Sequence, residues 1–530
     1  METKQKTLTQ KFDQYLLEFT MNYICKNPVR NAKHILWAFN KLGMFKEHQK
    51  AMDGIKNVLS QHDSSWVKFL NSMKKELNSN VFEKFLKNML LKSGLIGRVR
   101  REELRQGLQM QVPWTVLMDP TTACNLDCIG CWAAEYEKGD SLSYELMDRI
   151  VREGKEIGTF MYVFSGGEPL MRKKDIIKLC DTHQDCYFLA FTNGTLVNEE
   201  LAKEIARVGN FTLAFSIEGF EQDNDARRGK GVYAKVLKGM EVMKQHGNLF
   251  GYSTVYHRNN TEVIGSYEFV DLMEEKGCRF GWNFTYMPVG TDAPKDLIVT
   301  PEQRKFMFHK IREIRNSRAM FLMDFWNDGE FTGGCIAGGR HYFHVNSKGD
   351  AEPCAFMHYS NMNIKDHSLM EVLKQPLFEE YRKAQPFNHN HMRPCPCLDN
   401  PDKLRTMVNN AKAKSTQLHD NESVEHLTSK CEAHAASWAP VSDHLWKWDH
   451  DTTIDHKAEA DKMWEYIKNI PKVDIGVDPE TRKEEARKMK AAARSNGTNN
   501  NGTSNNGNGK GSTPADVKDE NILIKTEDIV

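Results

Sequence analysis

The stretch that decides the fold of this chain is Thr122-Ala-Cys-Asn-Leu-Asp-Cys-Ile-Gly-Cys-Trp132. Its cysteines Cys124, Cys128 and Cys131 are spaced so that all three can bind one metal ion or metal cluster. Structural zinc usually takes four ligands from paired C-x2-C knuckles, and no second knuckle lies near these three. A cubane iron–sulfur cluster held by three thiolates leaves one iron open, and its reactivity depends on what occupies that corner. The spacing therefore favours an iron–sulfur cluster over zinc. We call Cys124, Cys128 and Cys131 the first cysteine triad.

Short apolar segments alternate with helical patterns from residue 114 onward. Helical spacing runs from Tyr144 to Ile157 and from Thr261 to Lys276. This alternation predicts a parallel sheet of βα units. Parallel βα barrels place their chemistry at the C-terminal ends of the strands, where the candidate site loops of this chain lie. The predicted strands are 114–119, 161–165, 187–192, 211–216, 250–256 and 279–286.

The C-x3-C-x2-C spacing followed by an aromatic residue resembles the signature of the radical S-adenosylmethionine (SAM) superfamily. The resemblance implies an α/β fold, a partial (βα)6 barrel, and a [4Fe-4S] cluster whose open iron chelates SAM. It also implies reductive cleavage of SAM to a 5′-deoxyadenosyl radical, which takes hydrogen from an unreactive carbon. An electron donor such as ferredoxin or flavodoxin would be needed.

Loops after the second and fourth predicted strands resemble SAM-binding motifs of this superfamily. Gly166-Gly167-Glu168-Pro169 resembles the GGEP motif, in which backbone groups and the Glu168 carboxylate receive the SAM ammonium. Ser216 and Glu218 resemble the positions that hold the ribose hydroxyls. Taken singly, each motif also reads as an ordinary turn or strand end. Their order after the cysteine loop is what makes them specific.

The resemblance also implies contacts to the SAM carboxylate and adenine. Arg228 matches the basic residue that pairs with the carboxylate, a role that suits a planar guanidinium, and Arg227 is the alternative. Trp132 and the Tyr286-Met287-Pro288 turn are expected to flank the adenine.

A second group of cysteines follows the predicted barrel. Cys335 and Cys354 bracket a predicted hairpin of 342–345 and 350–353 that turns at 346–349. This arrangement resembles the start of the SPASM and "twitch" extensions, which carry auxiliary iron–sulfur clusters. The full SPASM pattern continues with a dense block of four cysteines, and this chain has only Cys395, Cys397 and Cys431 there.

The later cysteines are enough for one auxiliary [4Fe-4S] cluster. The expected ligands are Cys335, Cys354 and Cys395, with Cys431 or Cys397 as the fourth. His389 and His391 are alternative ligands, although a solvated loop is the simpler interpretation. The other alternative is that these cysteines are ordinary reduced thiols.

Length and charge suggest several parts in the 530-residue chain. The expected divisions are a basic helical segment at 1–110, the barrel at 111–318, the auxiliary-cluster domain at 319–440, helices at 441–494 and a disordered tail at 495–530. The net charge of zero conceals +10 in residues 1–110 and −10 in the rest. The basic segment is predicted to cap the barrel, to lie on an anionic membrane surface, or both.

Cluster chemistry needs a reducing compartment, and no signal peptide is recognised. We therefore expect a cytoplasmic protein, either free or peripheral at the inner face of the cell membrane. No apolar stretch approaches the ~18 residues that span a bilayer, and no nucleic-acid partner is expected.

Longer sequence runs resemble a lipid-acting group within the superfamily. They include Met118-Asp-Pro-Thr-Thr-Ala-Cys124, Asp324-Phe-Trp-Asn-Asp-Gly and Cys335-Ile-Ala-Gly-Gly-Arg340. This similarity implies coupling of two acyl tails into membrane-spanning (diabolic acid type) lipids, with a lipid or other hydrophobic substrate. The alternative is a radical SAM/SPASM peptide maturase or another small-molecule enzyme. A non-enzymatic cluster-binding regulator would not need the SAM contacts.

Overall fold

The computed structural model describes residues 65–133, 139–290, 293–417, 421–451 and 453–474, with a few positions between 20 and 34. The chain divides into two units, Met1–Thr481 and Arg482–Val530, and every described residue lies in the first. Most of the basic segment before residue 65 and the polar tail at 495–530 lie outside the described residues. In the part that is described, no helix is long and apolar enough to cross a membrane.

One large sheet organises the described residues, with strand order β7-β6-β5-β4-β3-β2-β1-β8-β9. Neighbouring strands pair in parallel from β7 to β8, and the β8–β9 pair is antiparallel. The strands are β1 (Thr115–Met118), β2 (Met161–Phe164), β3 (Tyr187–Thr192), β4 (Phe211–Ser216), β5 (Phe250–Tyr256), β6 (Phe280–Thr285), β7 (Phe321–Asp324), β8 (Tyr342–Val345) and β9 (Ala351–Glu352). A small second sheet pairs β10 (Tyr359–Ser360) with β11 (Lys414–Ser415).

The predicted α/β fold with parallel βα units is confirmed, and the sheet extends beyond the six predicted strands. The parallel strand β7 adds to β6 at one edge. At the other edge β8, the first strand of the predicted hairpin, pairs in parallel with β1, so that Thr115 lies opposite Tyr342. The auxiliary extension therefore continues the barrel sheet, and the predicted boundary at residue 318 falls inside that sheet.

Alternate residues of each strand belong to different cores, as the two-residue period of a strand requires. Val116 and Met118 of β1 pack in the core under the surrounding helices. Leu117, between them, belongs to a second core that also contains Leu189 of β3. Both faces of the sheet are thus covered, which explains why the strands read as nearly continuous apolar runs.

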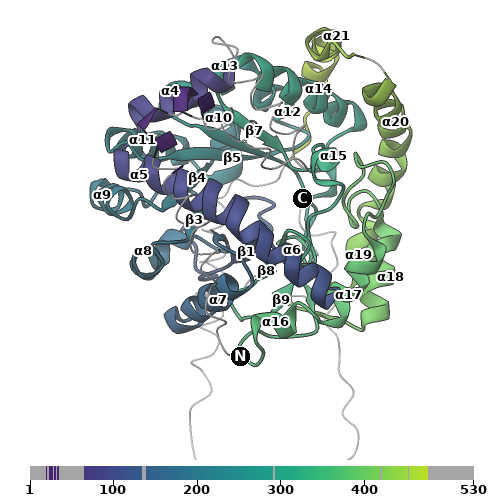
Figure 1. The fold of residues 1–530 in the computed structure, drawn as a ribbon. Coiled ribbons are helices and arrows are strands. Elements are labelled where there is room, and N and C mark those ends of the chain that lie inside the picture. The colour runs from purple at the N-terminus through teal and green to yellow at the C-terminus, as the bar shows by residue number, and fades with distance from the viewer. Residues whose placement is uncertain are drawn as a thin grey trace, which may run out of the picture. The chain divides into compact units, whose positions relative to one another are not determined.

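Helices connect the parallel strands and cover the sheet (Figure 1). Side-chain caps set several helix starts; the Ser143 hydroxyl, for example, accepts from the N–H of Leu146. The helix predicted at 261–276 is divided at Gly265-Ser266, because Ser266 caps a new helix by accepting from Phe269 N–H. The connecting helices are α7 (Tyr144–Glu156), η3 (Pro169–Arg172), α8 (Lys173–Thr182), α9 (Glu199–Val208), α10 (Glu221–Arg228), α11 (Val232–Gln245), α12 (Thr261–Ile264), α13 (Tyr267–Lys276), η4 (Lys295–Leu297) and α14 (Pro301–Ser317).

The described part of the basic segment is helical and packs on the barrel. Its elements are α4 (Ser65–Glu76), α5 (Ser79–Lys84), the π-helix η2 (Phe85–Ile96) and α6 (Gly97–Leu108). Asn88 of η2 is buried, and its amide donates to the carbonyl oxygens of Gln184 and Cys186 just before β3. This contact agrees with the cap interpretation. Membrane docking stays a prediction without support from the structure.

Helices after the sheet form the C-terminal part, in green to yellow in Figure 1. They are α16 (Leu369–Val372), α17 (Pro376–Ala384), α18 (Pro401–Ala411), α19 (Val424–Ser429), α20 (Glu432–Asp451) and α21 (His456–Lys468), whereas the short helix α15 (Gly329–Thr332) lies between β7 and β8. Helix α20 runs through residue 440, where the sequence suggested a division.

Candidate functional site

The first cysteine triad lies in the loop that leaves β1, and the exit of β2 fixes this loop. A Cβ atom at Gly167 would lie 2.4 Å from Ala123 O, and one at Gly166, where φ is +98°, would lie 2.7 Å from Thr121 O. The N–H groups of Gly167 and Glu168 donate to Thr121 O and Ala123 O over 3.0 and 2.8 Å. Only glycine permits so close an approach. The Gly-Gly pair therefore holds the cysteine loop against β2.

A cavity of about 210 Å³ brings most of the predicted SAM contacts together. Its lining includes the first cysteine triad, Trp132, Gly166, Gly167, Glu168, Ser216, Arg227 and Arg228. Pro169 and Glu218 do not line it, and neither does the predicted adenine turn at 286–288. Tyr286 instead packs beneath the cysteine loop, where a Cβ at Gly130 would lie 2.9 Å from its ring.

The chemistry of these thiols fits a metal cluster. Burial raises the pKa of Cys124 to about 12. Burial also raises the pKa of Cys128, although nearby Arg228 acts in the opposite direction. Such thiols ionise only when a cation binds them, which a metal cluster provides. The residues present therefore fit a cluster held by three cysteines.

Glu168 is buried and already accepts three hydrogen bonds. Its donors are the N–H of Leu170 at 2.9 Å, the Thr192 hydroxyl at 2.7 Å and the N–H of Asn193 at 2.7 Å. Burial raises the pKa of the Glu168 carboxyl despite these donors. The carboxylate thus ties β2 to β3 at the cavity edge, and its predicted contact with the SAM ammonium stays a prediction.

Glu218 is held by both candidate arginines. Its Oε1 accepts from Arg227 Nη1 at 2.6 Å and from Arg228 Nε at 3.0 Å, while Oε2 accepts from Val255 N–H at 2.9 Å. Burial alone would raise the pKa of Glu218, but the two guanidinium groups outweigh it and lower the pKa. This geometry favours Ser216 over Glu218 as a hydroxyl contact, since Ser216 lines the cavity. It leaves Arg227 and Arg228 as alternatives for the SAM carboxylate.

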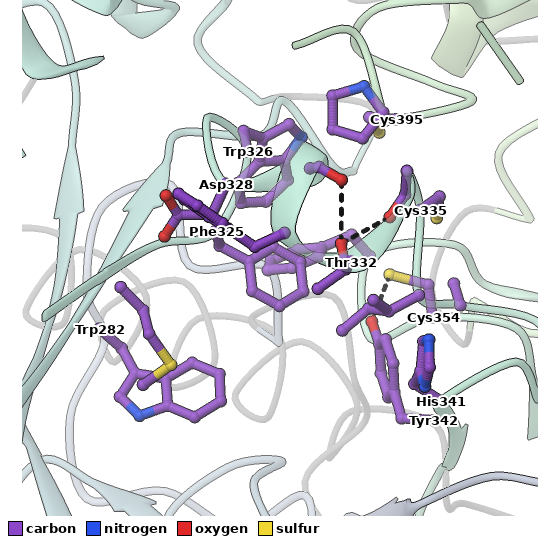
Figure 2. Close-up of a pocket in the computed structure, with 18 of the residues that line it drawn as sticks. Trp282, Phe325, Trp326, Asp328, Thr332, Cys335, His341, Tyr342, Cys354 and Cys395 are labelled. Atoms are coloured by element: carbon purple, nitrogen blue, oxygen red, sulfur yellow. Dashed lines mark hydrogen bonds between the residues drawn. The ribbon is translucent and has the colours of Figure 1, made fainter. Parts of the chain in front are cut away.

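Cys335, Cys354 and Cys395, which we call the second cysteine triad, line a larger cavity of about 750 Å³ (Figure 2). The Tyr342 hydroxyl donates to Cys354 Sγ over 2.8 Å. Burial raises the pKa of Cys335 to about 12 and that of Cys354 to about 11. As in the first cysteine triad, the donor set fits a metal cluster.

The fourth ligand predicted for the auxiliary cluster lies apart from this cavity. Cys431 and Cys397 are buried, with their sulfur atoms 3.7 Å apart, and neither lines the cavity. His389 and His391 do not line it either. The structure therefore groups Cys431 with Cys397, and the choice of a fourth ligand stays open.

Comparison with protein families agrees with the two cysteine sites. A model described as the radical SAM superfamily matches residues 118–270, and the SPASM model, described as an iron–sulfur cluster-binding domain, matches residues 335–398. This chain is therefore an enzyme with a radical SAM domain and a SPASM domain. Its cofactors are SAM, the [4Fe-4S] cluster that binds it and an auxiliary iron–sulfur cluster.

Three relatives illustrate what this radical SAM enzyme is similar to. It is 32% identical to the Fe-coproporphyrin III synthase of Methanosarcina barkeri over 30% of this chain and 41% of that protein, less than half its length. It is 23% identical to the AdoMet-dependent heme synthase of Oleidesulfovibrio alaskensis over 52% of this chain and 78% of that one. It is 24% identical to the PqqA peptide cyclase of Granulibacter bethesdensis over 52% and 77%, respectively. None of these names refers to a lipid, so the expected likeness to lipid-acting proteins is unsupported.

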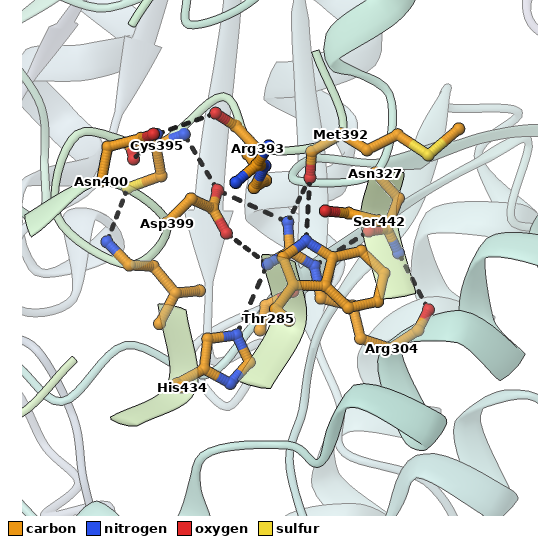
Figure 3. Close-up of polar contacts among 12 residues, drawn as sticks. Thr285, Arg304, Asn327, Met392, Arg393, Cys395, Asp399, Asn400, His434 and Ser442 are labelled. Atoms are coloured by element: carbon orange, nitrogen blue, oxygen red, sulfur yellow. Dashed lines mark hydrogen bonds and ion pairs between the residues drawn. The ribbon is translucent and has the colours of Figure 1, made fainter. Parts of the chain in front are cut away.

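A buried ion pair anchors Cys395 in this radical SAM enzyme (Figure 3). Asp399 Oδ2 accepts from Cys395 N–H over 3.0 Å, and the Asp399 carboxylate pairs with Arg304 of α14. Both charged side chains are wholly buried. The Arg304 guanidinium also lies 4.4 Å from the ring centroid of Trp438 and donates to Met392 O. Helices α14 and α20 thereby position the loop that carries Cys395.

The walls of the larger cavity were not predicted from the sequence. They include Trp282 of β6 and, after β7, Phe325 and Trp326 (Figure 2). Phe331 of α15 also lines the cavity. Asp328 is among the few charged groups of this lining, where it pairs with Arg315. The run Asp324-Phe-Trp-Asn-Asp-Gly indicated a family resemblance in the sequence. The sequence did not show that this run forms a cavity wall, because the residues of the wall come together only in the folded chain.

Proposed function

We propose that this enzyme removes a hydrogen atom from a C–H bond of a peptide, or of another small molecule with an apolar part, bound in the larger cavity. The observation that carries the proposal is a wall shared by the two cavities. Trp114, Trp282, Phe325, Tyr342 and Phe356 line both. A substrate in the larger cavity would therefore lie beside the SAM cavity.

Different residues of the chain would carry out different parts of the proposed reaction. The first cysteine triad would hold the SAM cluster, with Ser216 and Arg228 or Arg227 contacting SAM. When bound, SAM and its cluster supply a radical strong enough to take hydrogen from an unactivated carbon, with an external electron donor. The aromatic walls exclude water and hold the substrate carbon, which prevents side reactions of a reactive species. The second cysteine triad, which lines the larger cavity, would hold the auxiliary cluster.

Polar groups in the cavity favour a substrate that is not purely hydrocarbon. The Oδ1 atom of Asp328 is buried and lacks a hydrogen-bond partner, while its Oδ2 accepts from Asp324 N–H over 2.7 Å. Arg315 adds a guanidinium beside it. A polar group of the substrate would find a partner in the Asp328–Arg315 pair, whereas an acyl tail would not. Relatives named for porphyrin, heme and peptide reactions agree with this preference.

Product analysis after anaerobic reconstitution tests the proposal. The enzyme would be incubated with SAM, a reductant and separate peptide, small-molecule and lipid extracts, followed by mass spectrometry. We expect peptide or small-molecule fractions to stimulate 5′-deoxyadenosine formation and to gain a modified product. Modification in the lipid fraction alone would overturn the substrate class.

Matched variants separate the roles of the two cavities. Cys124→Ala should abolish 5′-deoxyadenosine formation, whereas Cys180→Ala, at a buried thiol of α8 outside both cavities, should not. Trp282→Ala should reduce product formation while uncoupled SAM cleavage continues. Trp464→Ala, which removes a partly buried indole that packs on Phe306, is its control. Equal effects of the two tryptophan variants would contradict the assignment of the cavity.

A further inference from the structure

Three buried side chains outside both cysteine sites converge at the β8–β9 hairpin. His344 lies on β8, Glu352 ends β9, and His358 follows the hairpin. Each offers one ligand atom, and these atoms all lie within 4.8 Å of one another. His344 and Glu352 are 0% exposed and His358 is 2% exposed. This His-Glu-His cluster takes no part in the proposed reaction.

The distances within the cluster are close to those between ligands of one ion. Glu352 Oε2 lies 2.7 Å from His344 Nδ1 and 3.1 Å from His358 Nδ1. Zinc lies about 2 Å from its nitrogen and oxygen ligands, so ligand atoms on one ion are roughly 3–4 Å apart. Two imidazoles with one carboxylate form a donor set that suits zinc or ferrous iron.

A second shell surrounds the three candidate ligands. Asp119, at the end of β1, places Oδ2 2.8 Å from His344 Nε2, which leaves His344 Nδ1 directed at Glu352. The other oxygen of Glu352 accepts from the Thr416 hydroxyl at 2.6 Å and from the Asn346 amide at 2.9 Å. A carboxylate on the far nitrogen of a histidine and hydrogen bonds to a ligating carboxylate are the outer-shell contacts that metal sites use.

The charge of the cluster calls for a cation. Asp119 and Glu352 are both wholly buried carboxylates. Within the residues that the structure describes, no Lys or Arg side chain forms a salt bridge with either one. Two buried negative charges are costly unless positive charge lies beside them. Either two protonated imidazoles or one divalent ion with neutral imidazoles would supply it.

We propose that His344, Glu352 and His358 bind one divalent first-row transition ion, for which zinc is the probe. Three protein ligands leave a position for water. The ion would join β1, through Asp119, to the hairpin that carries Cys354 two residues after Glu352. It would also fix Trp132, whose ring stacks on His358 at 5.9 Å and meets His344 edge-on at 6.0 Å. Because Trp132 lines the SAM cavity, the ion would fix the position of this part of the cavity wall.

Zinc stoichiometry is the first test. Full-length protein with reconstituted clusters would be incubated anaerobically with zinc chloride, desalted and measured by elemental mass spectrometry. We expect about one zinc per chain in the wild type and about none in His358→Phe and Glu352→Gln, because metal affinity depends on the ligands. His183→Phe, at a buried histidine elsewhere, should bind zinc like the wild type. A zinc-free wild type would show an ion-pair network only, and equal loading of all variants would place the zinc elsewhere; either result would overturn the proposal.

Two further measurements do not depend on variants that fold poorly. X-ray absorption at the zinc edge of the wild type should show nitrogen and oxygen at about 2.0 Å without sulfur at about 2.3 Å. Sulfur ligation would place the zinc in a cysteine site and overturn the proposal. Asp119→Asn keeps the side chain's size and should weaken zinc binding roughly 10- to 100-fold. An unchanged affinity would contradict binding through His344 Nδ1. These readouts are independent of enzyme activity and of the substrate.

Discussion

Replacing Asp399 by Asn should destabilise the C-terminal part of the enzyme strongly. The change keeps the side chain's shape and an oxygen that can accept from Cys395 N–H, but it removes the negative charge beside Arg304. Arg304 is wholly buried, so its charge would be left without a counter-ion. Breaking a buried ion pair in this way costs about 3–5 kcal/mol, which is a factor of roughly 10² to 10⁴ in the unfolding equilibrium.

Urea unfolding of reconstituted protein, followed by circular dichroism under anaerobic conditions, measures this loss. Glu432→Gln is the control, because its pair with Arg405 is solvent-exposed and should contribute only about 0–1 kcal/mol. The double variant Arg304→Met/Asp399→Asn should recover much of the stability, since no buried charge then lacks a partner. A loss below about 1 kcal/mol for Asp399→Asn, or no recovery in the double variant, would refute the reasoning.

Three further predictions concern the two cluster sites and a buried acid. Changing the first cysteine triad to Ala should abolish 5′-deoxyadenosine formation and leave about four irons per chain; an iron count near zero would exclude an auxiliary cluster. Tyr342→Phe removes the hydrogen bond to Cys354 Sγ and should make the reduction potential of the auxiliary cluster more negative in a spectroscopic titration; an unchanged potential would separate Cys354 from the cluster. Burial and nearby Asp328 raise the pKa of Asp324 to about 6 in the folded protein. The protonated carboxyl therefore contributes stability below the pKa of the unfolded chain, and this contribution is lost as the pH rises through about 6. Relative to the wild type, Asp324→Asn should therefore gain roughly 1 kcal/mol in free energy of unfolding between pH 5 and pH 7. If urea unfolding gives the same difference between variant and wild type at both pH values, the assignment is contradicted.

Local patterns were sufficient to predict the strands of the barrel. The ranges 187–192, 211–216 and 250–256 agree with β3, β4 and β5 residue by residue, because buried parallel strands are short apolar runs bounded by turn residues. The hairpin after Cys335 was also predicted. Its parallel pairing with β1 was not, since that contact joins segments more than two hundred residues apart and leaves no local signal.

In the two cysteine sites too, contacts that depend on the folded chain could not be predicted from local sequence patterns. Motif order predicted which loops meet at the SAM cavity, and the structure brings the first cysteine triad, Glu168, Ser216 and Arg228 together. Motif order could not show that Glu218 is occupied by two arginines, because the short helix α10 brings those arginines back onto it. Likewise, sequence spacing treated Cys397 and Cys431 as interchangeable, whereas packing places their sulfur atoms in contact range.

Substrate choice is the feature that sequence motifs constrained least, and the structure gives the reason. The cavity wall is assembled from Trp66 of α4, Trp282 of β6, Phe331 of α15 and Tyr381 of α17, each from a different part of the chain. The motifs for the cluster and SAM lie on other loops and stay the same whatever the wall encloses. A basic N-terminal segment and shared cluster motifs therefore carry no information about whether an acyl tail or an amide enters this cavity. Asp328 and Arg315 do carry it, because a charged pair in an aromatic wall costs binding energy for a hydrocarbon and provides a contact for a polar group.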